Sequence, residues 1–220
     1  MSNKRHCMGE KVKKAILQRI CDGVYAPGER LIELQIASEF QTSQAPVREA
    51  LCKLESMRIV ETEPYKGTRV REISGEELAE CLQIRAVLEN LAAELVGDRL
   101  LGMMDLLKER AKETVRAARD KDLLRYSKAN LDFHRLIVEA SSSQILISLW
   151  DSLAPEVRMF ASVKENAENL KDAANDHLEI VEAFEEGDNR YAGKLLKKHA
   201  ESGLINSFCR RIETNGGRKS

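Results

Sequence analysis

Residues 43–70, SQAPVREALCKLESMRIVETEPYKGTRV, contain the pattern that decides the fold of the first part of this chain. Ser43 is a favourable helix N-cap, and Pro46 falls in the first turn, where a proline interrupts no helical hydrogen bond. The apolar residues that follow recur with helical spacing and predict a helix over about 43–57 with one buried face. Two β-prone runs then flank Pro64–Gly67 and predict a hairpin.

The segments before this stretch also have a helical pattern. Periodicity predicts helices over about 10–22 and 33–40, which are separated by the helix-breaking Gly23 and the Pro27-Gly28 pair. A helix, a turn, a second helix and a hairpin in this order predict a winged helix-turn-helix. In that fold the first turn of the second helix, the recognition helix, enters the major groove of DNA.

Polar side chains at the start of the recognition helix are candidates for DNA contacts. Gln44 and Arg48 lie four residues apart and therefore share one helix face. Arg48 can pair with a guanine edge or a phosphate, Gln44 can read adenine, and the small Ala45 permits a close approach. At the hairpin tip, Lys66 and Gly67 offer a cation and a bare backbone to a phosphate or the minor groove. We therefore expect DNA contacts from Ser43, Gln44, Ala45, Arg48, Lys66 and Gly67. The alternative is a capped core helix with a solvated arginine.

Composition narrows the class of protein. The 220 residues carry 35 Lys and Arg against 36 Asp and Glu, but residues 1–73 hold 13 basic against 10 acidic side chains, which is compatible with a nucleic-acid-binding head. No apolar run has the length of a membrane span, and the start of the chain has no secretory pattern. The five cysteines are scattered without a CxxC pair. This indicates reduced thiols and a cytoplasmic protein.

After Ser74 the pattern becomes entirely helical. Six amphipathic segments follow, at about 75–98, 103–120, 122–141, 145–165, 170–186 and 189–213. The sequence therefore predicts a mostly α protein with a winged helix-turn-helix domain over 1–74 and an all-α antiparallel helical bundle over 75–220.

Three of the predicted bundle helices turn a histidine toward the core: His134, His177 and His199. His177 and His199 lie 22 residues apart with Gly187-Asp188 at the midpoint. In an antiparallel helical hairpin both would therefore lie at the same height, about 16 Å from the turn. Three converging neutral imidazoles can bind a borderline divalent metal, although a single inward histidine is more often a hydrogen-bonded core residue.

Two further polar residues are predicted to face the same interior. Asn130 lies one turn before His134 on the same helix face. Arg85 lies among apolar residues, and an inward arginine needs an anion. Either Glu89, one turn further on, or a bound carboxylate can supply this anion.

The head resembles a known family. The stretch at 43–70, together with ILQRICDGVYAPGERLIELQIASEF at 16–40, is similar to the DNA-binding head of the GntR family of bacterial transcription regulators. The family usually has Arg at the position of Gln44 and Thr or Ser at the position of Ala45. Both residues lie on the reading face, so we do not carry over an operator sequence from relatives.

The bundle resembles the FadR-type C-terminal domain, called FCD. The matching segments are QIRAVLENLAAEL, NLDFHRLIVEASSS, DHLEIVEAFEEGD and KKHAES. The resemblance implies a divalent metal such as Zn, Ni or Mn at His134, His177 and His199, and an effector-binding role for Arg85. The fourth ligand is usually an Asp where this chain has Asn130, a poorer ligand. Six helices instead of seven favour the VanR-type branch.

These observations favour a homodimeric regulator that is not an enzyme. Its binding to double-stranded operator DNA would respond to a small organic acid held near the metal. The alternative is a metal-dependent hydrolase on a helical scaffold, since three histidines can also hold catalytic zinc. Against it, Asp132 is predicted to point away and Asp176 to lie off the inner face, which leaves no carboxylate as general base. An adaptor without a nucleic-acid role would leave Arg48 and Lys66 unexplained.

Overall fold

The computed structural model describes residues 2–216, and it describes side chains for residues 8–202. The chain divides between Ser74 and Gly75 into two compact units. The N-terminal unit is a winged helix-turn-helix and the C-terminal unit is helical, so the predicted mostly α fold class is confirmed. Among the described residues, no helix is both long and apolar enough to cross a membrane.

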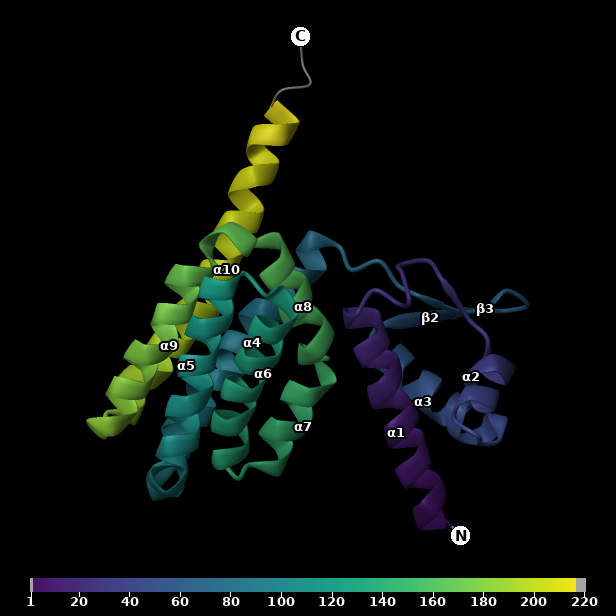
Figure 1. The fold of residues 1–220 in the computed structure, drawn as a ribbon, viewed down its shortest axis with the longest axis horizontal. Helices are drawn as coiled ribbons and strands as arrows, with labels where there is room; N and C mark the ends of the chain where they lie inside the picture. Colours follow the sequence, from purple (N-terminus) through teal and green to yellow (C-terminus); the bar gives the residue numbers. More distant parts are fainter. Residues whose placement is uncertain (1, 217–220) are drawn as a thin grey trace. The chain divides into compact units, whose positions relative to one another are not determined.

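The N-terminal unit contains three helices and a small sheet. Its elements are α1 (Ser2–Cys21), β1 (Arg30–Leu31), α2 (Glu33–Glu39), α3 (Gln44–Ser56), β2 (Val60–Glu63) and β3 (Gly67–Val70). The recognition helix α3 packs against both α1 and α2 (Figure 1). The sheet is antiparallel with the order β1-β3-β2, and Glu63 pairs with Gly67 at the wing tip. The short β1, which the sequence pattern did not predict, pairs Leu31 with Thr68.

Apolar side chains from all these elements form the core of the N-terminal unit. Val12 and Ile16 of α1 and Val47 and Leu54 of α3 are completely buried. Full burial of such a side chain contributes about 1.5–3 kcal/mol, so the helical stripe predicted for α3 does hold this unit together. Ser43 occupies the N-cap position of α3, but its side chain makes no capping hydrogen bond, so that detail of the prediction is wrong.

The C-terminal unit is a bundle of α-helices with two short 3₁₀ segments. Its elements are α4 (Gly75–Leu95), η1 (Gly97–Met103), α5 (Met104–Asp120), α6 (Leu123–Ala140), α7 (Gln144–Ser152), α8 (Pro155–Glu165), η2 (Ala167–Asn169), α9 (Leu170–Glu185) and α10 (Asn189–Gly216). The helix α10 lies along α4 and beside α9, and α6 packs against α4, α5 and α8 (Figure 1).

The predicted single helix over 145–165 is wrong, because it is divided into α7 and α8. Ala154 lies between them in the left-handed region with φ 45°, and Pro155 begins α8. A residue before proline is disfavoured in the helical region, and the proline has no N–H to continue the ladder. The described part of this unit therefore has seven α-helices, not the six that favoured the VanR-type branch.

A close contact between α4 and α10 brings the site together. A Cβ added to Gly193 would lie 3.0 Å from the backbone oxygen of Asn90, so this position of α10 accepts no side chain without a shift. Residues of both helices belong to the main apolar core, which also contains the fully buried Trp150, Phe133 and Ile137. The inner face of α4 thus packs into this core, and Arg85 and Glu89 are buried on the same helix.

Candidate functional site

The three bundle histidines lie together inside the C-terminal unit. His134 comes from α6, His177 from α9 and His199 from α10, and all three are buried. One ligand atom from each lies within 4.8 Å of the others. The rings of His134 and His199 are stacked with 5.3 Å between their centroids, and those of His177 and His199 are 4.5 Å apart. The antiparallel arrangement of α9 and α10 thus brings the matched histidines to the same height.

Each histidine has one ring nitrogen beside an oxygen. Nδ1 of His134 lies 2.9 Å from Oε2 of Glu89, and Nδ1 of His199 lies 3.0 Å from Oδ2 of Asp176. Nε2 of His177 lies 2.8 Å from Oδ1 of Asn130. Carboxylates beside Nδ1 are the usual outer partners of metal-binding histidines, because they orient the ring and leave Nε2 for the metal.

Other atoms of the cluster lack hydrogen-bond partners although they are buried. Among the described residues, both ring nitrogens of His134 and Nδ1 of His177 have none, because Nδ1 of His134 lies close to Oε2 of Glu89 without hydrogen-bond geometry. A buried polar atom without a partner is unfavourable by about 1–3 kcal/mol. The orphaned nitrogens, the close spacing and the all-nitrogen donor set fit a divalent metal of the zinc type.

The protonation states of the buried histidines and of Glu89 also suit metal binding. Burial lowers the pKa of His134 to about 4, although the nearby Glu89 opposes this shift. Burial and the two neighbouring histidines lower the pKa of His177 well below its usual value. Burial alone would raise the pKa of Glu89, but Arg85 and His134 outweigh it and lower this pKa to about 2. At neutral pH the imidazoles of His134 and His177 are therefore neutral, the form that binds metals, and Glu89 is ionised.

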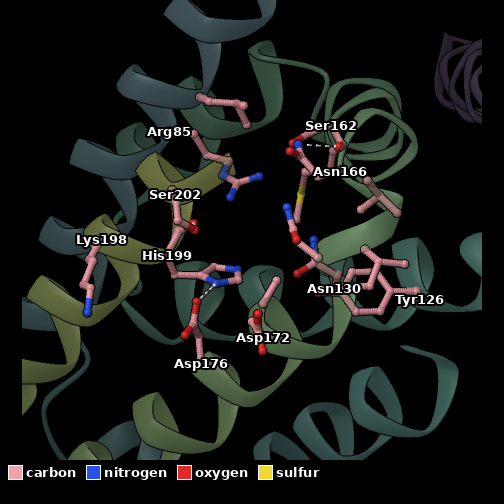
Figure 2. A pocket seen from close by; sticks show the side chains of 17 residues that line it. Arg85, Tyr126, Asn130, Ser162, Asn166, Asp172, Asp176, Lys198, His199 and Ser202 are labelled. Atoms are coloured by element: carbon pink, nitrogen blue, oxygen red, sulfur yellow. Dashed lines mark hydrogen bonds and ion pairs between the residues drawn. The ribbon is translucent and has the colours of Figure 1, made fainter. Parts of the chain in front are cut away.

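Arg85 reaches the same region from α4. Its side chain is 7% exposed, and its Nε lies 3.2 Å from Oε1 of Glu89. Glu89 is therefore its internal anion, one of the two possibilities that the sequence left open. The guanidinium nevertheless extends into an adjoining cavity, where it is available to a ligand (Figure 2).

This cavity has a volume of about 440 Å³ and opens between α4, α6, α8, α9 and α10. Its polar lining includes Arg85, Tyr126, Asn130, Ser162, Asn166, Asp172, Asp176, Lys198, His199 and Ser202 (Figure 2). A cavity of this size with a few convergent polar groups is typical of a small-molecule site. Arg85 and His199 point into it together, so one small anion can contact both the arginine and the histidine cluster.

The sequence prediction for Asp176 is wrong. This residue lines the cavity and contacts His199. Asp176 precedes His177 on α9, and consecutive residues of a helix point about 100° apart. This rotation turns the carboxylate of Asp176 toward α10, where His199 lies. Asp132, in contrast, points away as predicted and lies 3.6 Å from Arg110. The contact of Glu89 with His134 was also missed; its inward position one turn after Arg85 was the available signal.

The predicted DNA-contacting residues are exposed or half-buried on the N-terminal unit. The side chain of Arg48 is 64% exposed, with its Nε 2.6 Å from Oε2 of Glu33. Its Nη2 donates to Oε1 of Gln44 at 3.1 Å, so these two side chains are neighbours. Ser43 is exposed at the start of α3, and Ala45 is half-buried beside Gln44. Near its N-terminal end, α3 thus carries the long side chain of Arg48 and the amide of Gln44 next to each other.

At the wing tip, the side chain of Lys66 is 66% exposed and lies 2.5 Å from Glu63. Gly67 has φ 83°, a conformation that favours glycine. A Cβ at Gly67 would also lie 3.2 Å from Nε of Arg30. Arg30 therefore adds a second cation to the tip, which the sequence pattern missed because it did not predict β1.

Residues 8–70 match the family model described as bacterial regulatory proteins, gntR family, and residues 80–202 match the FCD domain. The chain belongs to the GntR family. A relative named "Probable D-xylose utilization operon transcriptional repressor" from Paenarthrobacter nicotinovorans is 30% identical over 207 residues, covering 91% of this chain and 88% of the relative. The "Gluconate operon transcriptional repressor" of Bacillus licheniformis is 27% identical over 205 residues, covering 89% and 83%. The solved structure of McbR/YncC from E. coli has the same fold, with a TM-score of 0.77 at 22% identity over 93% of this chain and 98% of that one.

This GntR-family chain is thus a transcriptional regulator with a winged helix-turn-helix that binds double-stranded DNA and an FCD domain. The hydrolase alternative has no support, because the named relatives are repressors. Asp176 does reach the cavity, but its carboxylate is bound to His199, where it can orient the ring.

Proposed function

We propose that this GntR-family regulator senses a small organic acid in its FCD domain and changes its affinity for operator DNA in response. One observation carries the proposal: the guanidinium of Arg85 and the cluster of His134, His177 and His199 adjoin the same cavity. An arginine and a metal both attract carboxylates, and the interaction is stronger in a partly dry site than in water.

His134, His177 and His199 would hold a divalent metal such as Zn²⁺, Ni²⁺ or Mn²⁺, with Asn130 as a neutral fourth ligand. When bound, the metal supplies positive charge for an effector carboxylate. Glu89 and Asp176 orient two of the three rings from outside the ligand set. Arg85 would bind the same carboxylate group or a second acidic group of the effector.

On the N-terminal unit, Gln44 and Arg48 would read the operator in the major groove, close to the half-buried Ala45 and the exposed Ser43. Lys66 and Gly67 would contact a phosphate or the minor groove. The internal partners Glu33 and Glu63 hold Arg48 and Lys66 in the DNA-free protein. When these cations neutralise phosphates instead, counterions are released from the DNA, which would make binding depend on salt concentration.

The regulator would act as a homodimer on a two-fold operator. Apolar side chains of α4 recur every three or four residues on its outer face; they are Ile84, Val87, Leu91 and Leu95, which are 41–57% exposed. Nothing in the described part of the chain covers this stripe. A second copy is the occupant that it fits, because a two-fold operator requires two heads and a two-fold interface is made of the same surface on each copy.

An operator-selection experiment tests the proposal. Purified protein is used to enrich duplexes from a random-sequence library, and the binding of the enriched duplex is followed by fluorescence anisotropy. We expect a two-fold-symmetric site, and at least one small carboxylate should change the operator affinity of the Zn²⁺-loaded protein about 5- to 150-fold. Enrichment of no duplex, or an operator affinity that no carboxylate changes, would contradict the proposal.

A further inference from the structure

Glu89 contacts both parts of the candidate site from behind. Its Oε1 lies 3.2 Å from Nε of Arg85 and accepts a hydrogen bond of 2.9 Å from Nε1 of Trp150. Its Oε2 lies 2.9 Å from Nδ1 of His134. The Glu89 side chain is 1% exposed, and it does not line the cavity. A ligand in the cavity would therefore meet Arg85 and His199, but not the carboxylate of Glu89 that lies beside Arg85 and His134.

Arg85 and His134 compete for the negative charge of Glu89, because each lies beside one of its two carboxylate oxygens. A guanidinium close to a buried carboxylate draws on its negative charge, which leaves it a weaker acceptor for a second donor. The histidine that donates Nδ1–H to a carboxylate is in turn a better metal ligand through Nε2. Whatever weakens the hold of Arg85 on Glu89 should therefore strengthen His134 as a ligand.

We propose that Glu89 is a positioning residue that couples carboxylate binding at Arg85 to metal binding at His134. This inference rests on the proposed metal and effector site. A carboxylate that shares Arg85 reduces the pull of the guanidinium on Glu89, and Glu89 then attracts Nδ1 of His134, which lies 2.9 Å from its Oε2, more strongly. The two ligands thus support each other through one buried side chain, in addition to any direct contact between them. The fixed Trp150 keeps Oε1 in place, so the carboxylate does not rotate away.

A Glu89→Gln variant tests the coupling through two affinities that should move in opposite directions. Its amide is a weaker acceptor for His134, so the affinity for Zn²⁺, measured by chelator competition, should fall about 10- to 100-fold. The same change removes the counter-ion of Arg85. In the metal-free protein, acetate should therefore bind more tightly than in the wild type, as followed by NMR titration. A merely damaged fold would weaken both.

The matched control is Glu77→Gln on the same helix. Glu77 forms another buried ion pair, with Nη2 of Arg158 at 3.0 Å, and does not line the cavity. Its loss should lower stability but leave both affinities unchanged. A second readout is the tautomer of His134 in the metal-free protein, followed by ¹⁵N NMR. The wild type should carry its proton on Nδ1, and the Glu89→Gln variant should lose this preference.

The outcomes separate the coupling from the proposed function. Wild-type protein that takes up Zn²⁺, together with a Glu89→Gln variant in which both affinities fall or neither changes, would overturn the coupling alone. An unchanged His134 tautomer in that variant would do the same. Wild-type protein that takes up no Zn²⁺ would overturn the proposed metal site and the coupling with it. A lower Zn²⁺ affinity with a higher acetate affinity supports the coupling.

Discussion

Nε2 of His177 lies 2.8 Å from Oδ1 of Asn130, with both side chains buried at the centre of the bundle. A neutral amide thus occupies the place where the resemblance to FCD domains implies an aspartate. An amide oxygen can approach a metal, but it brings no charge. Under the proposal, metal binding would depend on the three histidines and on Glu89 and Asp176, which lie beside two of them.

The Asn130→Asp variant should therefore bind a divalent metal more tightly than the wild type. The new carboxylate adds an anionic ligand beside His177 without a change in side-chain size. Chelator competition with Zn²⁺ measures the difference. An Asn166→Asp variant, which adds the same charge elsewhere on the cavity wall, is the control and should have a smaller effect. Equal Zn²⁺ affinities for wild type and Asn130→Asp would argue against Asn130 as a ligand.

The Arg48→Ala variant should lose operator affinity by about 1–3 kcal/mol if Arg48 reads a base edge. Fluorescence anisotropy on the selected duplex gives this value. Arg119→Ala removes an equally accessible arginine, 71% exposed, from α5 and should leave DNA binding unchanged. Unaltered operator affinity in a folded Arg48→Ala protein would remove this face of α3 from the interface.

The Lys66→Ala variant should weaken binding to all duplexes to a similar extent, since a phosphate contact carries no sequence information. The slope of log affinity against log salt should become less steep by about 1. Titrations at several salt concentrations, on selected and random duplexes, measure both effects. A slope identical to that of the wild type would show that the wing tip does not meet the DNA backbone.

The Val87→Glu variant should be a monomer. It places a charge in the middle of the α4 stripe, where a second copy would bury it. Sedimentation at micromolar concentration distinguishes the two states. The control is Ile145→Glu on α7, where the side chain is 76% exposed and outside the stripe, and this variant should stay dimeric. A wild-type protein that sediments as a monomer, with and without DNA, contradicts the dimer.

Local patterns predicted the recognition helix, the wing hairpin and the inward histidines, because each depends on spacing within one or two neighbouring elements. The match between His177 and His199 needed only the length of one helical hairpin. Features that depend on contacts between distant segments could not be read in this way. Trp150 donates to Glu89 from 61 residues away, and β1 has only two residues and forms by pairing with β3.

The break at Ala154 and the position of Asp176 were missed for a different reason. The apolar pattern continues through Pro155 without a break, so periodicity alone predicts one helix where the structure has α7 and α8. A proline is also accepted in the first turn of a helix, and Pro155 occupies that position in α8. The prediction for Asp176 assumed that α9 has a single inner face, the one that carries His177. The α9 helix in fact has two inner sides, one toward the core and one toward α10 and the cavity.

The most direct test of the account is the metal content of the protein purified without chelators, compared between the wild type and His177→Ala. Elemental analysis should find about one divalent ion per wild-type chain and almost none in the variant, because two imidazoles and an amide hold a metal too weakly. His177 lies outside the DNA-binding unit, so operator binding without effector should persist in the variant. A wild-type protein that contains no metal, and takes up no Zn²⁺, Ni²⁺ or Mn²⁺ at micromolar concentration, would contradict the account.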